Sequence, residues 1–107
     1  MRAIKKDKFS RSRGGIYKIL SIVCVACGQE VLVYQKDGSG YLHRAYLNRI
    51  LAPEKFAKLQ DTAKSTKDLP NLICQCGKMI GVPMLHSEGR MAFRLVLGTI
   101  VKLQNRL

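Results

Sequence analysis

Short apolar runs separated by polar turns dominate the chain and predict a mainly β protein. Residues 16–23 (IYKILSIV) are apolar and β-branched, residues 29–35 (QEVLVYQ) alternate, and the run KDGSG at 36–40 is typical of a turn. The segment 41–51 also fits an amphipathic helix, but its aromatic and β-branched residues favour a strand. The strands that we predict cover residues 16–23, 29–35, 41–51, 72–74, 79–85 and 91–103.

One segment between these strands has a helical pattern instead. In residues 53–64 (PEKFAKLQDTAK), Phe56, Leu59 and Ala63 fall on one face of a helix, and the lysines fall outside that face. A proline near the start is tolerated because the first turn of a helix leaves its N–H groups unbonded. We therefore predict one short helix at about 53–64, followed by a loop.

The first 15 residues differ from the rest of the chain. They contain six basic residues and one acid, have no apolar period and end in Gly14-Gly15. This composition predicts a flexible basic N-terminal arm over residues 1–15. The remaining residues, 16–107, have the length of one small domain, which gains from an added staple such as a metal.

Four cysteines form two short pairs, Cys24-x-x-Cys27 and Cys74-x-Cys76, with 46 residues between them. Zinc binds four thiolates as a tetrahedron, so a closed site needs both pairs. A glycine follows each pair, where the chain has to turn away from the metal. We predict one structural Zn²⁺ held by these four cysteines, which makes residues 16–107 a zinc-binding β domain. An iron–sulfur cluster, a redox dithiol and ordinary buried thiols are the alternatives.

A weak internal repeat supports two similar hairpin units, each with one cysteine pair. The segment SIVCVACGQEVLVY corresponds to NLICQCGKMIGVPM, and RAYLNRI corresponds to RLVLGTI. His43 and His86 lie outside these pairs, and we expect surface or packing roles for both.

The start of the chain superficially resembles an export signal, because a basic stretch precedes an apolar one. Lys18 interrupts the apolar stretch, and a small-residue cleavage site is missing. No segment has the ~18 apolar residues that span a bilayer. We therefore expect a cytoplasmic protein (or a nuclear one in a eukaryote) with reduced thiols and no membrane partner.

The charge is strongly positive, with 19 Lys+Arg against 7 Asp+Glu and a net charge of +12. Such an excess is typical of proteins that bind nucleic acid, and Tyr side chains among basic residues favour RNA or single strands. The candidate phosphate contacts are Arg2, Lys5, Lys6, Lys8, Arg11, Arg13, Arg44, Arg49, Arg90 and Arg94.

Three segments resemble the Yippee-like and cereblon group of zinc-binding domains: CVACGQEVL, GYLHRAYLNRI and NLICQCGKMIGVP. The resemblance covers about residues 20–101 and implies two antiparallel sheets that meet at the zinc, a β-tent. The chain departs from the group in its C-x-C pair, in a helix-like insertion at 53–66 and in its lack of Trp, so the cyclic-imide ligands of cereblon are not implied. A simpler zinc ribbon explains the cysteine pairs almost as well.

Two functions follow as hypotheses. The first is a non-enzymatic zinc module that binds nucleic acid through its basic surface and N-terminal arm. The second, implied by the β-tent resemblance, is an adaptor that docks an acidic or ribonucleoprotein partner. No Ser-His-Asp set, acidic pair or phosphate-cradling Gly loop indicates an enzyme or a small-molecule substrate.

Overall fold

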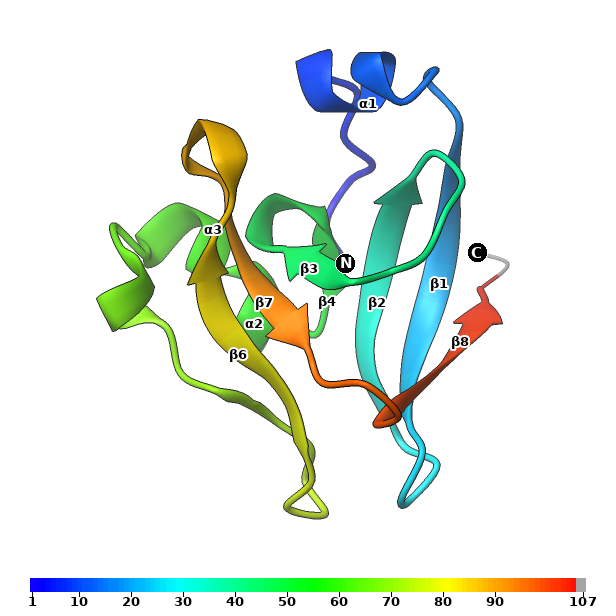
Figure 1. Cartoon of the computed structure of the whole chain (residues 1–107), viewed down its shortest axis with the longest axis vertical. Helices are drawn as coiled ribbons and strands as arrows, with labels where there is room; N and C mark the ends of the chain where they lie inside the picture. Colours follow the sequence, from blue (N-terminus) through cyan, green and yellow to red (C-terminus); the bar gives the residue numbers. More distant parts are fainter. Residues whose placement is uncertain (106–107) are drawn as a thin grey trace.

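Two four-stranded antiparallel sheets lie side by side with the apolar core between them, as the computed structural model of residues 1–105 shows (Figure 1). The first sheet, in the order β4-β2-β1-β8, consists of β1 (Tyr17–Cys24), β2 (Glu30–Asp37), β4 (Ile50–Ala52) and β8 (Ile100–Gln104). The second, in the order β3-β7-β6-β5, consists of β3 (Arg44–Tyr46), β5 (Leu72–Ile73), β6 (Met79–Leu85) and β7 (Met91–Leu95). The prediction of a mainly β protein with two antiparallel sheets is confirmed.

Burial along the β1–β2 hairpin shows which face of the first sheet packs against the core. In β1, Leu20, Ile22 and Cys24 are buried and alternate with half-buried residues, as the period of a strand requires. In β2, both faces are buried from Val31 to Gln35. One face of β2 packs into the core, and the N-terminal segment reaches the other through Gln35.

Two predicted long strands are each divided between the sheets. Residues 41–51 form β3, a 3-10 turn η1 (Leu47–Arg49) and then the start of β4, so the chain passes from the second sheet to the first. Residues 91–103 do the same through β7 and β8, with a turn at Gly98, whose φ is +77°. A straight strand would stay in one sheet, so the prediction of single strands here was wrong.

The internal repeat in the sequence coincides with the two places where the chain passes from the second sheet to the first. Arg44 and Arg94 are direct cross-strand partners in β3 and β7. Ile50 and Ile100, six residues further on, begin β4 and β8 in the other sheet. The two R-x-x-L-x-x-I segments therefore follow the same course from the second sheet to the first.

The helical prediction for 53–64 is confirmed as two short segments, α2 (Glu54–Ala57) and α3 (Leu59–Thr62). Phe56, Leu59 and Ala63 pack against the core, as the pattern predicts, and the Phe56 ring meets Phe93 edge-on with the ring centroids 6.4 Å apart. Two further 3-10 turns, η2 (Thr66–Asp68) and η3 (Ser87–Gly89), occupy loops. Within residues 1–105, no helix has the length and apolar character needed to span a membrane.

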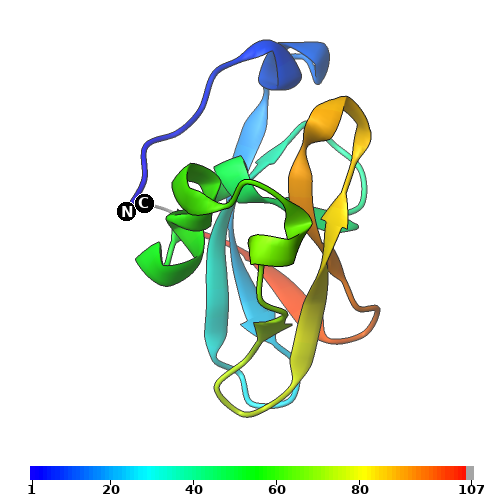
Figure 2. The same ribbon diagram turned by 90° about the vertical axis from the view of Figure 1, so that its left-hand side faces the viewer.

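The N-terminal segment is docked on the body of the protein, which corrects the prediction of a flexible arm over 1–15. It runs from beside α2 and α3 to a short helix, α1 (Lys8–Ser12), at one end of the molecule (Figure 2). The Arg2 N–H donates to the Leu51 carbonyl at 2.9 Å, and Lys5 and Gln35 exchange two hydrogen bonds of 2.8 Å. These bonds join residues far apart in sequence, so composition alone did not reveal them.

Asp7 both begins α1 and secures it to the body. Its carboxylate accepts hydrogen bonds from the N–H groups of Phe9 and Ser10 in a capping box. The same carboxylate receives the guanidinium of the buried Arg49, with one N–O distance of 2.7 Å. The hydrogen bond from Arg49 lowers the pKa of Asp7 from 3.8 to about 2.

Asp7 should therefore make stability depend on pH. Because its folded pKa lies below its unfolded value, its contribution is present above pH 4 and is lost as the pH falls towards 2. We expect Asp7→Asn to lower the melting temperature at pH 7, with the difference from the parent protein vanishing near pH 2. The matched control is Glu88→Gln, which removes an exposed ion pair with Lys8 and should change little. An equal effect of Asp7→Asn at both pH values would contradict this assignment.

Candidate metal centre

Two hairpin tips at one end of the molecule carry the four cysteines. Cys24 ends β1 and Cys27 lies in the turn to β2, while Cys74 follows β5 and Cys76 lies in the turn to β6. Both turns point to the same end of the two sheets (Figure 1). The four sulfur atoms all lie within 4.8 Å of one another, so the fold brings the two distant pairs together as the sequence predicts.

The distances between the sulfurs fit a single ion. Sγ of Cys24 lies 3.7 Å from Sγ of Cys76, and Sγ of Cys27 lies 3.5 Å from Sγ of Cys74. Four thiolates at about 2.3 Å from a tetrahedral ion lie about 3.8 Å apart, close to these values. All four cysteines are free, and a disulfide would require about 2.05 Å. The four residues can therefore hold one metal ion between the two sheets.

A hydrogen bond from the glycine to the first cysteine closes both tips, over a turn that is one residue shorter at the second cysteine pair. Gly28 N–H donates to the Cys24 carbonyl and Gly77 N–H donates to the Cys74 carbonyl, both at 2.8 Å. The φ angles of these glycines are +78° and +95°, a region that other residues avoid. The shorter C-x-C pair is therefore compatible with a metal-binding turn, because Gly77 permits the sharper reversal.

The ionisation of the thiols favours a bound cation. Burial acts to raise the pKa of Cys24, but the backbone N–H groups of Cys27 and Ala26 offset this and lower it to about 7. The pKa of Cys27 is raised to about 12: a backbone hydrogen bond at Gln29 lowers it, but burial and the neighbouring sulfurs outweigh that bond. Several thiolates this close repel one another, and a central cation removes that repulsion.

Nine of the ten candidate phosphate contacts lie at or near the surface, in three different environments. Arg2 pairs with Glu54 and Asp61, and Lys8 pairs with Glu88, all on the surface. Arg13, Arg44 and Arg90 line one hollow beside the N-terminal segment. The others at or near the surface, Lys5, Lys6, Arg11 and Arg94, are spread over the N-terminal segment and β7.

Arg49 is a correction to the predicted phosphate contacts. Its side chain is 1% exposed and forms ion pairs with Asp7 and Asp37 at 2.7 Å. A guanidinium enclosed by two carboxylates is already neutralised and presents no charge to a ligand. The sequence shows only a basic residue near a strand end, whereas its burial follows from the docking of Asp7 from 42 residues away.

The sequence analysis did not single out Lys36, which lines the hollow with the three arginines. Its position offered only a weak signal, since Lys36 is the first residue of the predicted turn KDGSG and directly follows the predicted strand at 29–35. Tyr41 is 84% exposed beside His43, with the two ring centroids 6.0 Å apart. His86 lies 5.8 Å from the Tyr46 ring, and neither histidine belongs to the cysteine cluster.

No family model, curated protein or solved structure matches this chain. The resemblance to the Yippee-like and cereblon group is therefore supported only by general features, namely a mainly β fold and four clustered cysteines at two hairpin tips.

Proposed function

We propose that the protein is a non-enzymatic module in which one structural Zn²⁺ joins two β-sheets and whose basic surface binds nucleic acid, RNA or single strands in particular. The arrangement of the sheets around the cysteines is compatible with a β-tent. The zinc stabilises the scaffold, and the surface cations contact phosphates. The observation that carries nucleic-acid binding is that most of the carboxylates pair with only three basic residues, which leaves the other cations among residues 1–105 unpaired.

Zinc is the ion that suits the cysteine site best. A tetrahedral set of four sulfurs selects zinc or iron–sulfur centres among the common metals. Sulfurs all within 4.8 Å of one another surround one ion, whereas a cluster with bridging sulfides needs them further apart. Four protein ligands leave no open coordination position, which is typical of structural and not of catalytic zinc.

The acidic residues leave the surface charge uncompensated. Five of the seven, Asp7, Asp37, Glu54, Asp61 and Glu88, form ion pairs with only three basic residues, Arg2, Lys8 and Arg49. Within residues 1–105, no other lysine or arginine forms an ion pair. The remaining cations therefore create a positive surface that attracts a polyanion.

An exposed aromatic ring among these cations favours single strands. Tyr41 lies in the loop between β2 and β3, with Lys36 and Arg44 lining the same hollow. Bases of a single strand stack on such a ring, while neighbouring cations hold the phosphates. In a duplex the bases are already stacked on one another.

We expect a labelled single-stranded RNA 20-mer to bind with an affinity that falls linearly with salt on logarithmic axes. A slope of about −3 to −4 corresponds to about five neutralised phosphates, at about −0.7 per phosphate of a single strand. Tyr41→Ala should weaken single-strand binding about tenfold and leave duplex binding nearly unchanged. Fluorescence anisotropy over 50–300 mM KCl measures both, and Tyr17→Ala, at another partly exposed tyrosine, is the control. Absence of binding at 50 mM salt would refute nucleic-acid binding.

A second candidate function, a protein adaptor, is favoured by an apolar surface near β8. Leu97 is 92% exposed, and Val96, Val101 and Leu103 are also exposed on or next to this edge strand. A protein partner that covers these residues would bind with little dependence on salt, because its core contact is apolar. Binding that persists at 300 mM salt and is lost in Leu97→Ser would support the adaptor instead.

A further inference from the structure

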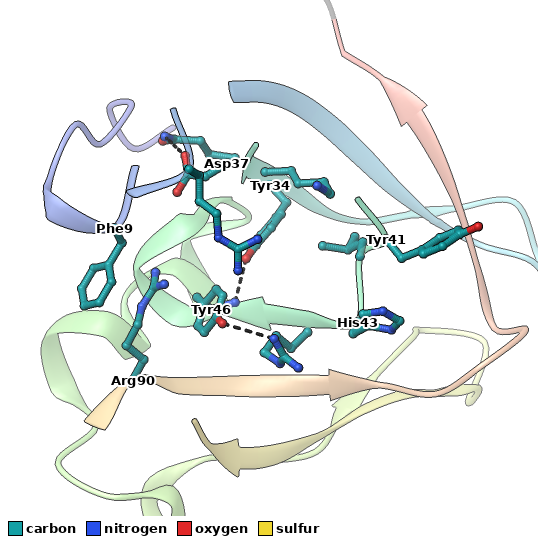
Figure 3. Close-up of a pocket in the computed structure, with 12 residues that line it drawn as sticks. Phe9, Tyr34, Asp37, Tyr41, His43, Tyr46 and Arg90 are labelled. Atoms are coloured by element: carbon teal, nitrogen blue, oxygen red, sulfur yellow. Dashed lines mark hydrogen bonds between the residues drawn. The ribbon is translucent and has the colours of Figure 1, made fainter. Parts of the chain in front are cut away.

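A small basic hollow lies between the N-terminal segment, the end of β2, the loop that follows it, and β3. Its volume is about 60 Å³. In Figure 3, Phe9, Tyr46 and Arg90 gather at one end of the hollow, and Tyr41 and His43 lie at the other. Four cationic side chains line it: Arg13, Lys36, Arg44 and Arg90.

The charge inside the hollow is not balanced by the protein. Asp37 is the one carboxylate among the lining residues, and both of its oxygens are engaged. One oxygen accepts from Arg49 Nε at 2.7 Å, and the other accepts from Gln35 Nε2 at 3.0 Å. The four cations therefore face a space in which the lining residues supply no free negative partner.

Stacking fixes the guanidinium of Arg90 at the wall of the hollow. Its central carbon lies 3.9 Å from the centre of the Phe9 ring and 3.6 Å from that of Tyr46, so both flat faces are covered. Only its edges can donate hydrogen bonds. Nη2 donates to Asn48 at 3.3 Å, while Nε is buried and has no hydrogen-bond partner among residues 1–105. An unpaired buried N–H is costly and is usually satisfied by a ligand or a water molecule.

Arg44 is also held in place, and the stem of Arg13 lies against the turn at Gly38. Arg44 Nη1 donates to the Tyr46 hydroxyl at 3.4 Å, and Arg44 lies directly opposite Arg94 in the sheet, a like-charge pair that destabilises the strands. Arg13 packs over Gly38, where an added Cβ would come within 3.0 Å of the Arg13 Cβ. Cations collected at a cost to folding indicate an anionic ligand.

The electrostatic field around the hollow agrees with this. The pKa of Lys36 is lowered by burial and then by the charges of Lys102 and Arg13. The pKa of His86 is lowered by burial and then by Arg44 and Arg90. Burial is the larger cause for both groups, and the nearby positive charges lower each pKa further.

We propose that this basic hollow binds a phosphate monoester, with Arg13, Arg44 and Arg90 donating to its oxygens. A monoester carries −1.5 to −2 charge at pH 7 and three acceptor oxygens, which matches several donors around a small space. A backbone phosphodiester carries one charge and a substituent on each side, so it suits the hollow less well. Mononucleotides and the terminal phosphate of a nucleic acid share this chemistry. The proposal goes beyond binding through the surface and does not require it.

The experiment follows the Nε–H signal of Arg90 by NMR during titration with inorganic phosphate and with AMP. Dimethyl phosphate serves as the diester control. We expect saturable shifts with the first two and at least tenfold weaker binding of dimethyl phosphate. Arg44→Gln should weaken phosphate and AMP about tenfold or more, the size expected for one lost charge-assisted hydrogen bond. This variant removes a like-charge pair, so it should keep its fold. Lys67→Gln, an exposed lysine outside the hollow, should bind as the parent does.

Two oligonucleotides, one with a 5′ phosphate and one with a 5′ hydroxyl, then separate the sources of the phosphate. Tighter binding of the phosphorylated strand, lost in Arg44→Gln, assigns the hollow to a nucleic-acid end, whereas AMP binding alone assigns it to a free nucleotide. Absence of a saturable shift, or equal binding of dimethyl phosphate, overturns the proposal. Unchanged binding in both Arg44→Gln and Arg13→Gln also overturns it. Binding of the 5′-hydroxyl strand tests the proposed function separately, because that strand offers no 5′ monoester.

Discussion

Chelation of the proposed Zn²⁺, or the substitution Cys74→Ser, is expected to abolish cooperative folding of the protein at 25 °C. The cysteines join the two sheets at one end, and Cys24 and Cys74 are buried. The second sheet depends on this joint, since β5 has only two residues. Structural zinc contributes about 10–16 kcal/mol to the folding of small domains, which equals or exceeds the 5–15 kcal/mol total stability of a typical domain.

Circular dichroism during titration with a zinc chelator measures this loss, and elemental analysis of the untreated protein should give one zinc per chain. Gln75→Ala is the matched control, because Gln75 is exposed in the same turn and supplies no sulfur. It should retain both the metal and the melting temperature of the parent. A reduced, metal-free protein that melts cooperatively at the parent temperature would show that the cysteine cluster does not hold the sheets together.

Arg49→Met is expected to destabilise the protein by about 3–5 kcal/mol, the cost of breaking a buried ion pair by removing one partner. The Arg49 side chain is 1% exposed, and its loss leaves the Asp37 side chain, 10% exposed, without a cation. It also releases Asp7, which secures the N-terminal segment. The Asp37 carboxylate then loses its ion pair in a largely buried site, whereas Asp7, at 35% exposure, remains partly solvated.

Urea denaturation of three proteins tests this expectation. Arg94→Met, at an exposed arginine, should change the free energy of unfolding by no more than about 0.5 kcal/mol. Arg49→Met combined with Asp7→Asn and Asp37→Asn should recover part of the loss, because no buried charge remains. Equal stability of Arg49→Met and Arg94→Met would mean that the buried network contributes nothing to folding.

Because the N-terminal segment is docked, the contribution of its basic residues to nucleic-acid binding should be tested by substitution and not by truncation. Truncation of residues 1–13 would remove Asp7 along with the lysines and arginines, so lost binding and lost stability would occur together. Neutralising Lys6 and Arg11, which are both exposed, changes the charge while the contacts of Arg2, Lys5 and Asp7 remain.

The sequence by itself determined the parts of this protein that depend on local patterns. Alternating apolar residues specified the β1–β2 hairpin, because the side chains of a strand alternate between two faces. The spacing of Phe56, Leu59 and Ala63 specified a helical face, and the two cysteine pairs, each followed by glycine, specified a cluster that can hold a metal ion. Each of these signals lies within a few residues.

Only the tertiary structure decided which charged side chains form ion pairs and which remain unpaired. Asp7 and Arg49 are 42 residues apart, and nothing in their neighbourhoods shows that they form a buried pair. The basic hollow likewise gathers cations from the N-terminal segment, β2, β3 and the start of β7. Ion pairs have no sequence period, so their partners are fixed only when the sheets pack and the N-terminal segment docks.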